Sequence, residues 1–149
     1  MSNRALYEQV ILDHNKKPRN FGPLPEATIK KEGLNPLCGD QFTLHLKVVG
    51  DHVEDIRFEG AGCAISKSSA SLMTTLVKGK SKAEIEVLFR KFHGMITSAP
   101  DVSLDPDALG KMAVFSGVRE FPVRIKCATL AWHTLMAALD EKPEPATSE

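Results

Sequence analysis

Three cysteines and one aspartate are the residues of this chain whose types are best suited to chemistry. They are Cys38, Asp40, Cys63 and Cys127, in the segments NPLCGD, GAGCAIS and RIKCATL. Thiolate sulfur and carboxylate oxygen are both zinc ligands, and zinc binds four ligands in a tetrahedron. A thiolate is also the nucleophile of thiol exchange. The four residues therefore indicate a metal site, a nucleophile, or both.

Each cysteine stands where one element of secondary structure is expected to give way to another. Cys38 lies in a turn before a strand, Cys63 opens a helix after Gly-Ala-Gly, and Cys127 lies in the first turns of the last helix. Such junctions gather at the end of a sheet, where separate segments can converge. The N-terminus of a helix favours an anion, so we expect lowered pKa values for the Cys63 and Cys127 thiols. Arg124 and Lys126 are expected to act in the same direction at Cys127.

The spacing of these residues leaves two interpretations open. Structural zinc sites often contain a Cys-x-x-Cys pair, which this chain lacks. Buried cysteine also serves as a small apolar side chain, so three packed cysteines with Asp40 in a turn are the alternative. If a metal is bound, Arg124 and Lys126 could offset the negative charge of the ligands. The carboxylate would then be the hard ligand that yields its place most readily among soft ones.

Length, charge and composition exclude several classes of protein. The 149 residues suit one domain with one core, and the formal net charge of zero argues against nucleic-acid binding through a basic surface. We find no apolar run near the ~20 residues that span a bilayer, and the charged N-terminal segment is unlike a secretory signal. An odd number of cysteines argues against a disulfide framework. We therefore expect reduced thiols in a cytoplasmic protein without membrane or nucleic-acid partners.

The periodicity of apolar residues predicts the elements that must position the cysteines. Alternation predicts three strands that form an antiparallel sheet with one face covered, and a period of 3.6 residues predicts helices. Ser81 and Glu84 form a capping box, and Asp105 with Pro106 is a good helix start. We expect one domain over 1–141 and a disordered, proline-rich tail over 142–149. Helices are expected near 4–16, 63–78, 81–93, 106–117 and 122–139, and strands near 28–34, 41–49 and 53–60.

Two further features suggest other chemistry but have simpler explanations. His14 precedes a loop that is rich in positive charge, yet the end of a surface helix accounts for it equally well. The glycines in GAGCAIS resemble a phosphate-binding loop, but the third glycine of that motif is missing and the flanking strands look antiparallel. Neither feature predicts a nucleotide site.

Four segments, in order along the chain, resemble a known family. YEQVILDHNKKPRNFG, NPLCGD, FEGAGCAISKSSASLM and RIKCATLAW look like the N-terminal segment and the three cysteine motifs of the IscU/SufU family of iron–sulfur cluster assembly proteins, related to the N-terminal domain of NifU. The resemblance implies an α+β fold, with a three-stranded antiparallel sheet and helices on one face. It implies that Cys38, Asp40, Cys63 and Cys127 converge on one metal site. It also implies that sulfur arrives as persulfide from a cysteine desulfurase.

Three features are more similar to the SufU type than to the IscU type. Lys126 precedes the third cysteine where IscU usually has histidine, and FPVRI replaces the LPPVK stretch that a dedicated Hsp70 chaperone reads. The segment between Cys63 and Cys127 also looks longer. The SufU type implies a zinc-dependent sulfur acceptor for a SufS-type desulfurase, one of whose histidines takes over a zinc position. That exchange would free Cys38, which Pro36 and Gly39 place in a loop.

The resemblance leaves the exact activity open. Cys38 is the expected persulfide acceptor and Cys127 the alternative, with sulfur passing to a downstream Suf scaffold complex or to apo iron–sulfur proteins. The same ligands could instead assemble a transient [2Fe–2S] cluster, so iron is the alternative to zinc. A third possibility is a zinc-stabilised interaction domain that transfers nothing. Whether the chain is an enzyme is therefore not decided by the sequence.

Overall fold

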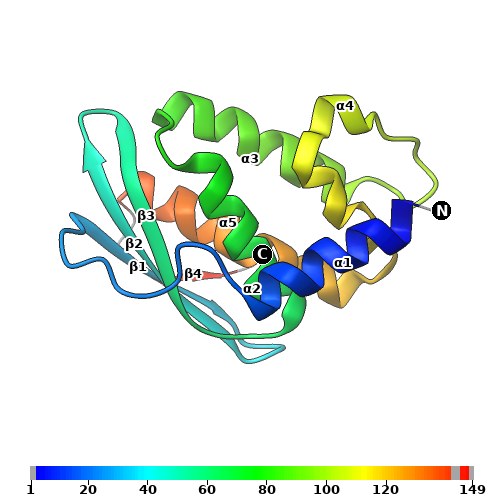
Figure 1. Cartoon of the computed structure of the whole chain (residues 1–149), viewed down its shortest axis with the longest axis horizontal. Helices are drawn as coiled ribbons and strands as arrows, with labels where there is room; N and C mark the ends of the chain where they lie inside the picture. The colour runs from blue at the N-terminus through cyan, green and yellow to red at the C-terminus, as the bar shows by residue number, and fades with distance from the viewer. Residues whose placement is uncertain (1–2, 142–144, 148–149) are drawn as a thin grey trace.

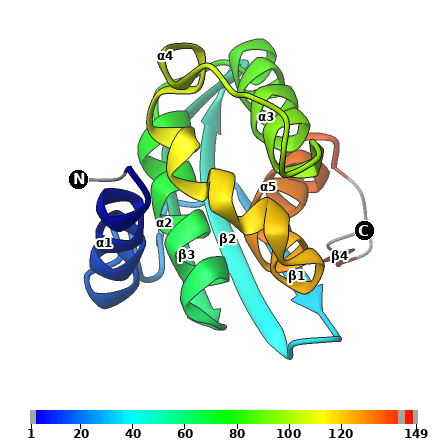
Figure 2. The ribbon, with the colours of Figure 1, turned by 90° about the vertical axis from the view of Figure 1, so that its right-hand side faces the viewer.

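The computed structural model describes residues 3–141 and 145–147 of the chain. Its helices pack on one face of a sheet, as Figures 1 and 2 show from two sides. The α+β fold expected from the sequence is therefore confirmed. In chain order the elements are α1 (Asn3–Lys16), β1 (Ile29–Asn35), β2 (Asp40–Val49), β3 (His52–Ala61), α2 (Ala64–Val77), α3 (Lys82–Thr97), α4 (Pro106–Leu109), the 3-10 helix η1 (Gly110–Glu120), α5 (Pro122–Leu139) and β4 (Ala146–Thr147).

The sheet differs from the prediction in its number of strands and in their direction. Strands β1, β2 and β3 pair antiparallel, as expected, but β4 adds a fourth strand parallel to β1, so the order is β3-β2-β1-β4 and the sheet is mixed. β4 has only two residues, too few for an alternating pattern, and it pairs with the edge that β1 leaves open. The tail was therefore wrongly predicted as disordered at Ala146–Thr147, while 142–144 and 148–149 lie outside the described residues.

The core lies between the sheet and the helices α2 and α5. Phe42, Leu44 and Leu46, which the alternation places on one face of β2, are fully buried. On β1, a side chain at Gly33 would collide with the hydroxyl of Thr134, so glycine lets α5 lie close against the sheet. This close packing fixes α5, and with it the position of Cys127, relative to the strands.

The helix starts agree with the sequence prediction better than the helix ends do. The Ser81–Glu84 capping box is present, and Asp105 caps α4 with Pro106 in its first turn. Helix α3 continues to Thr97, past the predicted end, because its later residues extend its buried face. The single helix expected over 106–117 is divided at Gly110, whose φ of 58° ends α4, and continues as η1. Among the described residues no helix has the length and apolar character needed to cross a membrane.

Candidate metal centre

Cys38 lies in the hairpin loop that joins β1 to β2. Asn35 and Asp40 pair at the end of the two strands, and residues 36–39 form the loop between them. The carbonyl oxygen of Asn35 accepts hydrogen bonds from the backbone N–H groups of Cys38 (3.2 Å) and Gly39 (2.8 Å). Gly39 has a φ of 73°, a conformation that glycine adopts without strain. The loop thus holds Cys38 at its tip, where its side chain is partly exposed.

Asp40 connects this hairpin to the start of α2. Its side chain is buried, with 2% of the residue exposed. One carboxylate oxygen accepts a hydrogen bond from the backbone N–H of Cys63 at 3.0 Å, and the other lies 3.4 Å from the side-chain amide nitrogen of Asn35. Because both oxygens are held in this way, the carboxylate has a fixed orientation beside the cysteines.

Cys63 is the N-cap residue of α2, at the helix start where the sequence places it. Its sulfur accepts a hydrogen bond from the backbone N–H of Ser66 at 3.4 Å, and the Ser66 hydroxyl lies 3.5 Å away. Burial alone would raise the pKa of this thiol, but its hydrogen bonds with Ser66 and Cys127 together outweigh burial and lower the pKa. The predicted lowering of the Cys63 pKa is therefore confirmed, and this thiol is prepared to ionise.

Cys127 differs from Cys63 in its surroundings. It faces inward from α5, with 1% of the residue exposed, and its sulfur lies 3.5 Å from the sulfur of Cys38. Burial, together with hydrogen bonds to Cys38 and Cys63, raises the pKa of the Cys127 thiol. The expected lowering was wrong because Cys127 lies beyond the first turn of α5, where the helix dipole fades, and next to two other sulfurs.

The two basic residues beside Cys127 have different positions relative to the site. A hydrogen bond to Cys127 and the negative charge of Cys63 raise the pKa of the Arg124 guanidinium, so this exposed side chain faces the thiols. The Lys126 side chain is also exposed, but within the described residues it makes no hydrogen bond or ion pair with the cysteines or Asp40. The structure therefore brings only Arg124 to the site.

The distances between the candidate ligand atoms fit a small tetrahedral ion such as zinc. One ligand atom each of Cys38, Asp40 and Cys127 lies within 4.8 Å of the others. Sulfur ligands of a tetrahedral zinc, each ~2.3 Å from the metal, lie about 3.8 Å apart. Cys63 is outside this tight group, although its thiol hydrogen-bonds with Cys127. A Cβ at Gly62 would lie 2.9 Å from the Asp40 carboxylate, so the backbone closes tightly around the site.

Sequence reasoning missed the role of Asn35 in this site. Its side chain is buried, and its amide nitrogen lies 3.4 Å from the Asp40 carboxylate and 3.8 Å from the Cys127 sulfur. Asparagine before proline is common in turns, so its residue type alone gave no reason to expect a link between two candidate ligands. Only the pairing of β1 with β2 and the packing of α5 place it there.

Comparisons with known proteins identify the family of this chain. Residues 6–141 match the family of NifU-like N-terminal domains. The zinc-dependent sulfurtransferase SufU of Bacillus subtilis strain 168 is 46% identical over 132 residues, which cover 88% of this chain and 87% of that protein. The iron–sulfur cluster assembly scaffold protein IscU of Thermotoga maritima is 37% identical over 142 residues, or 95% and 98% of the two chains. A solved structure from Fervidobacterium islandicum AW-1, described as an iron–sulfur cluster assembly scaffold protein for the SUF system (FiSufU), superimposes with a TM-score of 0.81 at 34% identity, covering 93% of this chain and 99% of that one.

Proposed function

The chain belongs to the family of NifU-like N-terminal domains, and on this basis we propose that it is a SufU-type sulfur acceptor in iron–sulfur cluster assembly. The proposed donor is a SufS-type cysteine desulfurase. The proposed recipients are a downstream Suf scaffold complex or apo iron–sulfur proteins, in the cytoplasm. The single observation that carries the proposal is a partly exposed loop cysteine, Cys38, in contact with a buried cysteine and next to a buried carboxylate.

We propose zinc as the resident metal, with Cys38, Asp40, Cys63 and Cys127 as its ligands. Two sulfurs and a carboxylate oxygen already lie within 4.8 Å of one another, and Cys63 has a lowered pKa that favours its thiolate. When bound, zinc would supply a Lewis acid that holds thiolates in their ionised form and ties the hairpin loop to α2 and α5. The Arg124 guanidinium would offset part of the negative charge of the ligands.

Cys38 is the proposed acceptor of the persulfide. Its thiolate would attack the outer sulfur of the desulfurase persulfide, so that a bond forms between that sulfur and Cys38. The bond to the desulfurase cysteine breaks at the same time, and that cysteine leaves as a thiolate. The exchange needs no oxidant or reductant. Cys127, with 1% of its surface exposed and a raised pKa, is the less suitable acceptor.

A scaffold for a [2Fe–2S] cluster is the second candidate function. It is favoured by the relative from Thermotoga maritima, which is named as an IscU scaffold protein. Cysteine thiolates are the usual ligands of such clusters, so the same residues could hold one as cargo. A zinc-stabilised domain that only binds partners would have the same ligands and would transfer no sulfur.

The rate of the desulfurase distinguishes these functions. We expect the zinc-loaded chain to raise the turnover of a SufS-type desulfurase at least about tenfold, a difference of about 1.4 kcal/mol in the barrier. After chelation the stimulation should be lost, and it should return when zinc is added back. Metal analysis and visible absorbance of anaerobically purified protein separate zinc, which is colourless, from a cluster. A zinc-loaded chain that leaves turnover unchanged would exclude the proposed transfer.

Reversing the charge of Arg124 is expected to weaken binding to the desulfurase. Arg124 is exposed and lies beside Cys63 and Cys127, so a partner that reaches these thiols must pass close to it. For Arg124→Glu we expect about tenfold weaker binding at low salt and a smaller effect at high salt, measured by titration calorimetry. Arg90→Glu, on the exposed side of α3, is the matched control. Equal affinities of the Arg124 variant and the parent at low salt would contradict the prediction.

A further inference from the structure

A cavity lies between α1, α2 and η1, away from the metal centre. It has a volume of about 500 Å³, and none of the four candidate ligands lines it. One part of its wall carries His14, Arg19, Lys111 and the acidic Asp13, and another part is apolar. We propose that this cavity binds a small organic anion, with its charged group at His14 and Lys111 and its apolar body against α1 and α2.

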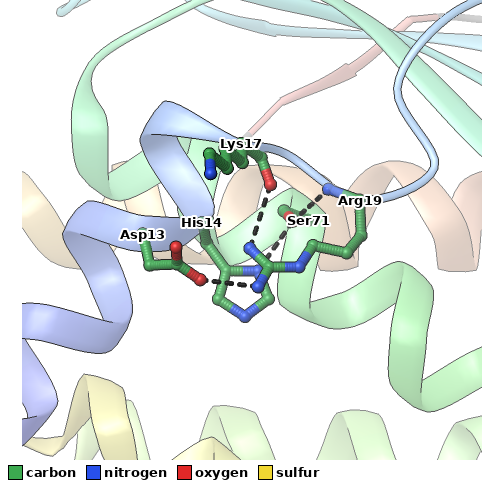
Figure 3. A network of polar contacts seen from close by, with 5 residues as sticks. All are labelled: Asp13, His14, Lys17, Arg19 and Ser71. Carbon is green, nitrogen blue, oxygen red and sulfur yellow. Dashed lines mark hydrogen bonds and ion pairs between the residues drawn. The ribbon is translucent and has the colours of Figure 1, made fainter.

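His14 is the residue that indicates a ligand. It is buried, with 8% of the residue exposed, although its sequence context suggested the end of a surface helix. Its Nδ1 lies 2.7 Å from the hydroxyl of Ser71 on α2, and Figure 3 shows the other ring nitrogen pointing away from Ser71. Within the described residues, Nε2 has no hydrogen-bond partner. Nε2 keeps exposed surface and His14 lines the cavity, so a ligand bound there can form a hydrogen bond with this nitrogen.

The hydrogen bonds of Ser71 favour one tautomer of the His14 ring. The backbone N–H of Arg19 donates to the Ser71 hydroxyl at 2.8 Å (Figure 3), so that hydroxyl accepts one bond there. Within the described residues, Nδ1 of His14 is the acceptor that lies next to the Ser71 hydroxyl proton, which favours the tautomer with Nδ1 unprotonated. In this tautomer the ring proton is on Nε2. His14 therefore presents an N–H donor to the cavity.

The charges around the cavity favour an anion. Asp13 and Arg19 form an ion pair, in which the guanidinium also donates to the carbonyl oxygen of Lys17 (Figure 3). Lys111 makes no ion pair within the described residues, so its positive charge is not balanced. Burial first, and then the charges of Arg19 and Lys111, lower the pKa of His14 against the opposing effect of Asp13. His14 is thus a neutral donor beside an unbalanced cation.

The remaining walls and the size of the cavity define the rest of the ligand. Leu6 and Val10 of α1, Leu72 of α2 and Val114 of η1 form its apolar lining. Sites for small organic ligands usually measure ~300–1,000 Å³ and combine apolar walls with a few polar groups. An inorganic anion alone would leave the apolar part of this cavity unfilled. The proposed ligand class is therefore a carboxylate, sulfonate or phosphate ester with an aromatic or aliphatic body.

Binding of benzenesulfonate to the full chain tests the proposal. This probe keeps one negative charge at all working pH values and has an apolar ring. We expect a dissociation constant of about 1 mM, as is usual for a ligand of about ten heavy atoms. The nitrogen signals of the His14 ring, followed by NMR, should shift during the titration. Neutral benzenesulfonamide and methanesulfonate, which lacks the ring, should each bind at least about fivefold more weakly.

Two variants locate the binding site. Lys111→Gln removes the unbalanced charge from an exposed position and should weaken benzenesulfonate binding at least about fivefold without affecting the fold. His14→Gln should weaken it similarly, and its circular dichroism shows whether it folds. Lys91→Gln, an equal loss of charge on α3, is the control and should bind like the parent. Equal binding by Lys111→Gln and the parent, or equal binding of the sulfonamide and the sulfonate, would overturn the proposal.

Discussion

Replacement of Cys38 by alanine is expected to reduce sulfur transfer from the desulfurase to this chain at least about 100-fold. The substitution removes the thiol at the tip of the hairpin loop, and the other two thiols are held on helices. Cys127 is buried and has a raised pKa. Cys63 has a lowered pKa, but the backbone N–H of Ser66 holds its sulfur in the first turn of α2, whereas Cys38 lies in a loop. The rate is measured with radiolabelled cysteine, as label bound to the chain after brief reaction with the desulfurase.

Loss of the metal and loss of the acceptor must be separated in this experiment. The zinc content of Cys38→Ala is therefore measured in parallel, and the parent persulfide is alkylated and located by peptide mass spectrometry. Leu37→Ala changes the exposed neighbour in the same loop and should keep most of the transfer rate. The label should be found on Cys38. Label on Cys127 in the parent, or a Cys38→Ala variant that accepts sulfur at the parent rate, would contradict the assignment.

The parts of the site that were predicted correctly depend on local signals. Cys63 follows a Gly-Ala-Gly segment and precedes a run whose apolar residues recur at helical spacing, so its place at a helix start could be recognised from nearby residues. Cys38 is flanked by Pro36 and Gly39, which are turn formers. In both cases the conformation depends on residues within a few positions. The order of the cysteine motifs added the resemblance to a family, which the comparisons confirmed.

The features that were missed or mistaken depend on contacts between distant segments. The burial of His14 requires α1 to pack on α2, where Ser71 is 57 residues away in sequence. Cys127 has a raised pKa first because packing buries it, and then because Cys38, 89 residues away, lies against it. The fourth strand consists of two residues that pair with β1 across the whole chain. A pattern in neighbouring residues contains no signal for such contacts.

Gly60 gives the prediction with the largest expected effect on stability. It pairs with Phe42 between β3 and β2 and has a φ of 132°, a conformation that other residues rarely adopt. A Cβ there would collide with the carbonyl oxygen of Gln41 and lie 2.9 Å from the Cα of Phe42. Because both are backbone atoms of a central strand, they cannot move away easily. For Gly60→Ala we expect a loss of about 3–5 kcal/mol in the free energy of unfolding, out of a typical ~5–15 kcal/mol.

Substitutions at two other glycines separate the cost of the steric clash from the cost of the unusual backbone conformation. Gly50 also has a positive φ, 63°, but a Cβ there would meet nothing within 4 Å, so Gly50→Ala should cost only about 1 kcal/mol. Gly94 lies inside α3 in open space and without a positive φ, so Gly94→Ala should stabilise by about 0.5–1 kcal/mol. Urea unfolding followed by circular dichroism measures all three variants. If Gly60→Ala lost no more stability than Gly50→Ala, the close approach of β2 to β3 at Gly60 would not constrain the fold as argued.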